Sequence, residues 1–195
     1  MRIVRYILCI TALASCNTEI QQKSGLQWFN TANFVDGLVA NMAKRNPQVS
    51  KSFTLNNNLE TKLYSKTDSL FWINELTKLR EIDLNAPKLR DVLTLKSGIN
   101  DAKSNLLIDV YSLAENEDIP FKKLSIYYLK EISEVRQIIM EFKADNPIAH
   151  STSKVNLWLS RYNDNLFIDS LIITGEDHVL MQATREYKSI TRTLL

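Results

Sequence analysis

The sequence predicts an α+β fold, in which two N-terminal helices and a hairpin pack on a curved antiparallel β-meander. In the first part of the chain, apolar residues recur at the spacing of one helical face. From Val92 onward they instead alternate with polar residues, in short segments separated by polar turns. The 195 residues are 45% hydrophobic and 24% charged, a globular composition that excludes wholesale disorder.

Helical spacing marks two segments. The first carries four apolar residues at i, i+3, i+4 and i+7, namely Val35, Leu38, Val39 and Met42. The second carries Trp72, Ile73, Leu76 and Leu79. Asn30 or Thr31 can cap the first helix and Thr67 or Asp68 the second. The second helix should end before Pro87, because the residue preceding a proline is pushed toward extended geometry.

The remaining apolar residues predict strands. Segments 51–55 and 59–64 flank the polar turn 56–58 and predict a hairpin. Three later strands are marked by alternation at Leu106, Ile108 and Val110, at Leu124, Ile126 and Tyr128, and at Val155, Leu157 and Leu159. Segment 132–143 fits a helix as well as a strand, and its β-branched residues favour the strand. A last segment is expected to run from Val179 toward the C-terminus.

The N-terminus has the three parts of an export signal. Arg2 and Arg5 give it a positive charge, an apolar stretch follows over 6–14, and small residues precede Cys16. The apolar stretch is too short for a membrane-spanning helix, which needs about 20 apolar residues. These features predict that the segment directs export.

The tetrad Leu13-Ala14-Ser15-Cys16 resembles the lipobox of bacterial lipoproteins. The resemblance implies that the Cys16 sulfur receives a diacylglyceryl group, that a peptidase cleaves just before Cys16, and that the new amino group is often acylated. The expected organisation is then a signal peptide over 1–15, a lipidated tether over 16–25 and a single α+β domain over 26–195. An ordinary secretory signal with a cysteine near the cleavage site is the alternative.

Cleavage changes the charge and the cysteine count. The precursor has 24 basic and 22 acidic residues, and removal of Arg2 and Arg5 leaves 24 − 2 = 22 of each. A chain without net charge lacks the basic footprint of a nucleic-acid-binding protein. Cys16 is the one cysteine that remains, so neither a disulfide nor a thiolate metal site is expected within the mature chain.

The anchor sets where the domain lies. Two or three acyl chains would hold the protein in the membrane, which is thus its first expected partner. A flexible tether of nine residues reaches roughly 15–18 Å, so the domain should sit close to the bilayer. In some bacteria Asp after the lipidated cysteine retains a lipoprotein in the inner membrane. Asn17 stands there in this chain, which favours the outer membrane, with the domain facing the periplasm or the cell surface.

Segments 51–62, 82–87 and 120–124 are similar to a loose family of uncharacterised bacterial envelope lipoproteins. Its members share a lipobox, an N-terminal helix, a hairpin, a second helix and a β-meander. The resemblance therefore implies the same fold for this chain. No catalytic or binding residues are established in the family, so no residue roles carry over.

Few residues suggest catalysis or metal binding. His150 and His178 are the only histidines, there is no G-x-S-x-G motif, and both are interpreted as surface or turn residues. Glu115, Glu117 and Asp118 could offer oxygens to calcium, but an exposed hairpin tip also explains them. We therefore expect no cofactor, no metal and no enzymatic activity; the alternative is a hydrolase built around one of the histidines.

Two binding functions remain open. The aromatic residues that could serve them are Trp28, Phe29, Phe34, Phe71, Trp72, Trp158, Tyr162 and Phe167. In one hypothesis they pack a solid core and the protein is a binding or scaffolding module for another envelope protein. In the other they line an apolar groove between helices and sheet that carries a lipid or an acyl chain. One apolar sheet face is what a layer of helices requires, so the sequence favours the protein partner.

Overall fold

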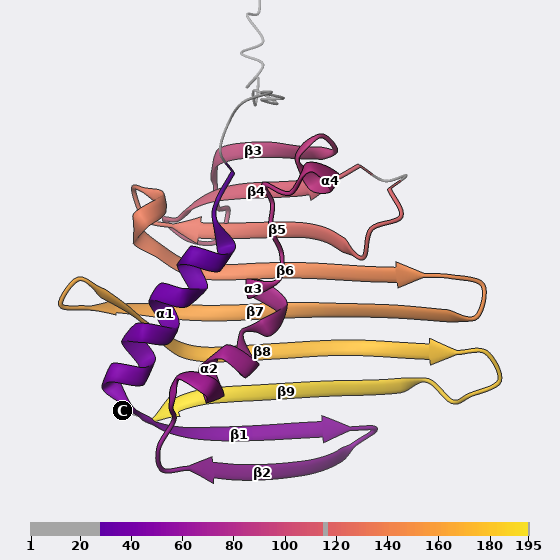
Figure 1. Cartoon of the computed structure of the whole chain (residues 1–195), viewed down its shortest axis with the longest axis horizontal. Helices are drawn as coiled ribbons and strands as arrows, with labels where there is room; N and C mark the ends of the chain where they lie inside the picture. Colours follow the sequence, from indigo (N-terminus) through magenta and orange to yellow (C-terminus); the bar gives the residue numbers. More distant parts are fainter. Residues whose placement is uncertain (1–27, 115–116, 195) are drawn as a thin grey trace, which may run out of the picture.

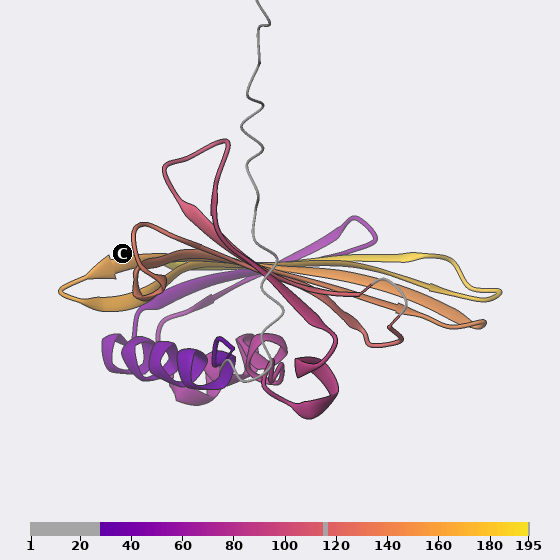
Figure 2. The same cartoon turned by 90° about the horizontal axis from the view of Figure 1, so that it is seen from above.

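The computed structural model describes residues 28–114 and 117–194, which form a single antiparallel sheet with helices on one face (Figures 1 and 2). The sheet has nine strands in the order β2-β1-β9-β8-β7-β6-β5-β4-β3 and is open, with β2 and β3 at its edges. The predicted α+β fold is confirmed.

The helices are α1 (Thr31–Arg45), α2 (Ser69–Glu75), α3 (Thr77–Arg80), α4 (Pro87–Arg90) and the short 3₁₀ helix η1 (Ile132–Glu134). The strands are β1 (Gln48–Leu55), β2 (Asn58–Tyr64), β3 (Leu93–Asn100), β4 (Leu107–Leu113), β5 (Phe121–Tyr128), β6 (Val135–Asp145), β7 (Ala149–Tyr162), β8 (Asn165–Val179) and β9 (Arg185–Leu194). Segment 132–143 is therefore largely a strand, as predicted, preceded by one 3₁₀ turn.

Helix α1 forms as its caps predict. The Asn30 side chain accepts a hydrogen bond from the Asn33 N–H at 2.9 Å, which satisfies one free donor of the first turn. At the other end Asn46 adopts a left-handed conformation and donates its N–H to the Met42 carbonyl. Lys44 and Arg45 lie in the last turn, where their positive charges interact favourably with the negative end of the helix dipole.

The predicted second helix is in fact two short helices. α2 ends at Glu75 and α3 begins at Thr77. The Thr77 hydroxyl donates to the carbonyls of Ile73 and Asn74, at 2.9 and 3.1 Å, and so competes with the regular helical hydrogen bonds at this point. Ile73, which the spacing placed on one apolar face with Trp72, is 36% exposed, whereas Trp72 is fully buried.

The hairpin of β1 and β2 belongs to the sheet itself. β1 pairs with β9, so the hairpin extends the meander beyond its last strand. Its turn contains only Asn56 and Asn57, both at positive φ, which is the conformation of a two-residue hairpin turn. Near the C-terminus, β8 continues to Val179 and β9 begins at Arg185, so the last strand starts later than predicted.

The buried face of β4 is the opposite of the expected one. Asp109 and Tyr111 are buried under the helices, whereas Ile108 and Val110 face away from them. Asp109 accepts hydrogen bonds from the Ser97 hydroxyl, the Gly98 N–H and the Tyr128 hydroxyl, at 2.7 to 2.9 Å. These donors make burial of the carboxylate possible, because a buried charge needs hydrogen-bond partners.

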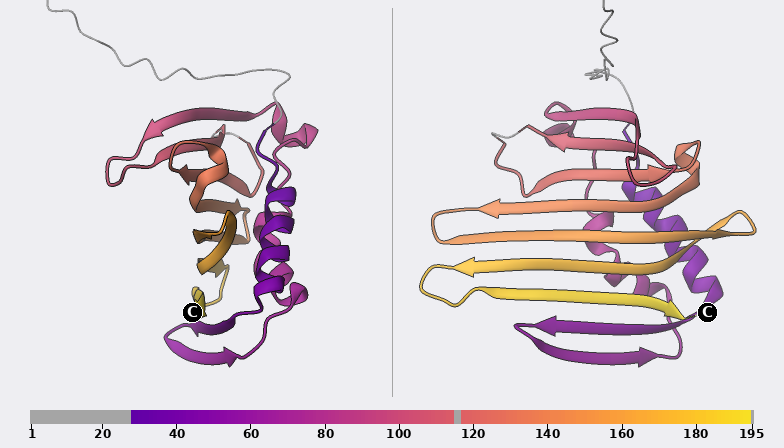
Figure 3. Two further views of the ribbon diagram at one scale, coloured as in Figure 1. Left: turned by 90° about the vertical axis from the view of Figure 1, so that its left-hand side faces the viewer. Right: turned by 180° about the vertical axis from the view of Figure 1, so that it is seen from behind.

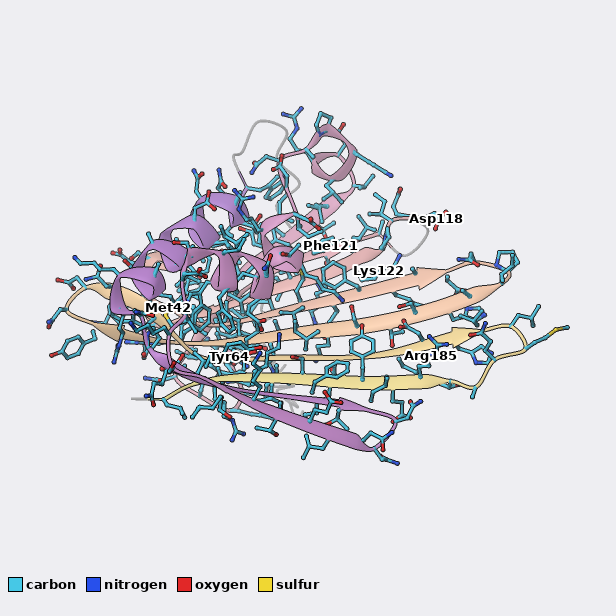
Figure 4. All side chains as sticks on the ribbon, turned by 60° about the horizontal axis from the view of Figure 1, so that its bottom comes forward. Met42, Tyr64, Asp118, Phe121, Lys122 and Arg185 are labelled. Carbon is cyan, nitrogen blue, oxygen red and sulfur yellow. The ribbon has the colours of Figure 1, made fainter. Side chains whose placement is uncertain are left out.

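The core lies between the helices and one part of the sheet, as Figure 3 shows from the side. Trp72, Met42 and Ile138 are fully buried there. Met42 projects from α1 toward the sheet (Figure 4), and its sulfur accepts the N–H of Ile168 at 3.2 Å. Beyond the helices, the far ends of β6 to β9 continue without a helical cover (Figures 1 and 2).

Candidate functional site

The sheet face opposite the helices, here called the open face, carries the candidate site. Strand alternation places on it the residues that neighbour the buried ones in sequence. An apolar band on this face crosses five neighbouring strands and consists of Tyr127, Ile139, Trp158, Ile172 and Ile190. Each of these side chains is partly exposed. No described helix lies on this face of the sheet (Figures 2 and 3).

Polar side chains also lie within the band and hydrogen-bond to each other. Gln137 is paired with both Tyr127 and Trp158 across the sheet, and its side-chain amide donates to the side-chain Oδ1 of Asn156 at 2.8 Å. Burial of the ring is the main cause that raises the pKa of Tyr127. The hydroxyl of Tyr127 can donate a hydrogen bond to a bound partner.

Charged rows border the band on the side of the β6–β7 and β8–β9 turns. Lys154 and Glu141 form an ion pair of 3.0 Å on neighbouring strands. Lys188, Glu176 and Glu186 lie further along the same face, and all five charged residues line a shallow hollow of about 610 Å³. The hollow contains both signs of charge, so it fits a mixed polar surface better than a single anion or cation.

The register brings together two histidines that sequence reasoning treated separately. Asp145, His150 and His178 are paired across β6, β7 and β8 on the open face. The His150 Nδ1 contacts the Asp145 carboxylate. The two imidazole rings are stacked with 6.2 Å between centroids, and His178 Nδ1 lies 3.1 Å from the Thr184 hydroxyl.

A serine hydrolase built on this row would need a serine hydrogen-bonded to one of the imidazoles. Ser151, the serine next to His150, points to the other face of the sheet, where its hydroxyl donates to Asp177 at 2.5 Å. In the described part of the chain neither imidazole is hydrogen-bonded to a serine, so a nucleophile–base pair is not assembled there. Asp145 and His150 are both more than half exposed, which leaves them open to water.

The acidic loop between β4 and β5 is described only in part, since Glu115 lies outside the described residues. Glu117 and Asp118 line a surface hollow of about 470 Å³ together with Lys122 and Lys143. Lys122 donates to the Glu117 carbonyl at 3.0 Å, and Figure 4 shows Asp118 and Lys122 at the same end of the sheet. Asp145 also lines this hollow, so three carboxylates and two lysines share it. Among residues 28–114 and 117–194, no group of three His, Cys, Asp or Glu could hold a metal ion.

Most aromatic residues considered for a groove pack against one another in the core. Trp28 meets Tyr111 edge-on at 5.8 Å, and Phe71 meets Trp72 in the same way at 5.1 Å. Phe29 and Phe34 also contact each other, 5.2 Å apart.

The aromatic residues expected in the sheet take three different positions. Trp158 belongs to the open face, and Tyr162 is 65% exposed beside the β7–β8 turn. Phe167 lies under the Arg45 guanidinium, which is 4.7 Å from the ring centre. These three side chains therefore do not form a common groove under the helices.

The lipobox, with the predicted lipidation at Cys16, lies outside the described residues, as do the signal peptide and the tether. None of the helices within 28–114 and 117–194 is long and apolar enough to cross a membrane. No protein-family model, no curated protein and no solved structure matches the chain.

Proposed function

We propose that the protein is a non-catalytic, lipid-anchored module of the bacterial envelope that binds another envelope protein through its open face. One observation carries the proposal: Tyr127 and Trp158 lie partly exposed on inner strands of a sheet face that no described helix covers (Figure 3). Tyr and Trp supply much of the binding energy of protein interfaces. The charged rows beside the band suit a partner with an apolar patch bordered by both signs of charge.

A lipid carrier is the second candidate, and the close packing of the core argues against it. A groove for an acyl chain requires an apolar cavity of about 300 Å³ or more. Between helices and sheet, Leu38, Trp72, Leu124 and Leu157 are fully buried against their neighbours. The hollows of about 470 and 610 Å³ instead lie at the surface among charged side chains.

The anchor is tested on the native protein. Mass spectrometry of the purified chain should find Cys16 as the first residue, carrying acyl chains. The variant Cys16→Ala should lose these chains and leave the membrane fraction. An unmodified soluble chain that begins at another residue would contradict lipid anchoring.

Binding through the open face is tested by photo-crosslinking in cells. A photoreactive amino acid at Tyr127 or Trp158 should yield one discrete protein adduct, whereas the same amino acid at Ala40, exposed on α1, should not. Equal adducts from Ala40 would refute the assignment of the face. Adducts with the mass of a phospholipid would support the carrier.

A further inference from the structure

Strand β2 leaves one long edge of the sheet unpaired in the described part of the chain. β2 is the first strand in the sheet order and pairs with β1 on one side only (Figure 1). Its side chains are almost all exposed, with Leu59 at 66% and Leu63 at 62%. Free edges of this kind are templates for pairing with another strand.

The turn determines which backbone groups of β2 point outward. In a two-residue turn the flanking residues, Leu55 and Asn58, bond to each other, and the bonding then alternates along the strands. The Asn56 N–H supports this alternation, because it points to the other side of β1 and donates to the Glu186 carbonyl of β9 at 3.0 Å. The N–H and C=O groups of Leu59, Thr61 and Leu63 therefore face away from β1.

The other edge of the sheet is protected against pairing. The register between β3 and β4 shifts between Lys96 and Ile99, where Gly98 has a positive φ of 68°. Such an irregularity interrupts the row of outward-facing backbone groups. β2 pairs with β1 without a register shift over all its residues, and it contains no proline.

We propose that β2 pairs with β2 of a second copy of this chain, antiparallel and two-fold symmetric about Thr61. This register places Leu59 opposite Leu63 of the second copy and Glu60 opposite Lys62 of the second copy, each pair occurring twice by symmetry. Apolar pairs and opposite charges directly across two strands both stabilise a sheet. The outward-facing residues Leu59, Thr61 and Leu63 supply the backbone hydrogen bonds.

The charges select this register and this partner. Centring on Thr61 uses the whole strand, Asn58–Tyr64, whereas centring on Leu59 or Leu63 leaves Glu60 and Lys62 without each other. A foreign strand with like charges at these positions would be repelled. The sequence of β2 is thus self-complementary, and the resulting dimer contains one continuous sheet across both copies.

Charge exchange provides the test, measured as copy number by native mass spectrometry of the full chain released from detergent. The unchanged protein should be a dimer. Lys62→Glu places glutamates opposite each other, Glu60→Lys places lysines opposite each other, and each should weaken the dimer about tenfold. The double variant Glu60→Lys/Lys62→Glu restores opposite charges and should restore the dimer.

Thr61→Pro is a second, independent variant. It removes an N–H that β1 does not use, so the fold should persist while edge pairing is lost. A thermal unfolding curve monitors the fold. A monomeric unchanged protein, a dimer that persists in Thr61→Pro, a dimer that the single charge variants do not weaken, or a double variant that does not regain the original dimer would each overturn the proposal. Association through the acyl chains alone would leave all variants alike.

Discussion

The ring of Tyr187 lies directly over Gly175 on the neighbouring strand. The two residues are partners in the register of β8 and β9, on the sheet face that carries the helices. A Cβ atom at Gly175 would approach the Tyr187 ring more closely than van der Waals radii allow. The glycine thus makes room for the ring, and the ring covers backbone that would otherwise be bare. Lys78 of α3 lies 6.0 Å from the ring centre, so this pair also meets the end of the helical layer.

A double-mutant cycle tests this relationship. Gly175→Ala should lower the free energy of unfolding by about 1 to 3 kcal/mol, because the new methyl group displaces the ring. In a Tyr187→Ala background the same change should stabilise the protein by about 0.4 to 1 kcal/mol, since alanine reduces the entropy of the unfolded chain. Urea titration of the four proteins measures the coupling. Equal effects of Gly175→Ala in both backgrounds would show that the ring does not depend on the glycine.

Glu75 connects the helical layer to the sheet. It lies at the end of α2, and its side chain is only 8% exposed. One carboxylate oxygen forms an ion pair with Lys51 of β1, and the other accepts the Thr191 hydroxyl of β9 at 2.7 Å. The carboxylate thus binds two neighbouring strands to the same helix.

Removing one member of the Glu75–Lys51 ion pair should destabilise the fold more than replacing both members with apolar residues. Thr191→Val leaves a buried carboxylate oxygen without its donor and should destabilise the fold by about 1 to 3 kcal/mol. Replacing the ion pair with apolar residues, in Glu75→Leu/Lys51→Met, should cost less than Glu75→Leu alone, because no charge is left unpaired. Urea unfolding midpoints of these variants give the comparison. A double variant that is less stable than Glu75→Leu would disprove this account.

Local patterns predicted the parts of the fold that depend on local interactions. Helix α1 has both an apolar face and a side chain that caps its start, and the structure begins it at Thr31 after Asn30, one of the two expected caps. The break after Glu75 depends on where one threonine hydroxyl donates, and apolar spacing across 72–79 does not report this. Strand β4 was assigned the wrong face, because burial of Asp109 becomes favourable only with donors from β3 and β5.

The open face could not be predicted in full either, because it depends on pairing between strands that are distant in sequence. Alternation in each strand could place Trp158 or Ile172 on one face, but the apolar band also requires the register between strands. Turn lengths set that register, and a shift by one residue moves a side chain to the opposite face. The β7–β8 turn contains Asn163 and Asp164 alone, both at positive φ. The His150–His178 contact likewise follows from the pairing of β7 with β8.

Tyr128 makes the hydrogen bonds around Asp109 sensitive to high pH. Its hydroxyl donates to the Asp109 carboxylate at 2.8 Å. Burial, followed by this hydrogen bond and the carboxylate charge, raises the pKa of Tyr128 to about 12. Burial and the same carboxylate raise the pKa of Tyr111 to about 12 as well. In the unfolded chain both hydroxyls should titrate near the ordinary tyrosine pKa of about 10.

The fold should therefore lose stability between about pH 10 and pH 12. In this range the unfolded chain releases protons that the folded chain retains, so the free energy of unfolding falls as pH rises, while below about pH 10 these groups contribute no pH dependence. Tyr111→Phe/Tyr128→Phe should flatten this decline, although loss of a donor to Asp109 lowers stability at neutral pH. Tyr162→Phe is the matched control, because Tyr162 is 65% exposed and should retain the original slope. Urea unfolding at a series of pH values measures the slopes, and a double variant as steep as the unchanged protein would exclude these tyrosines as the cause.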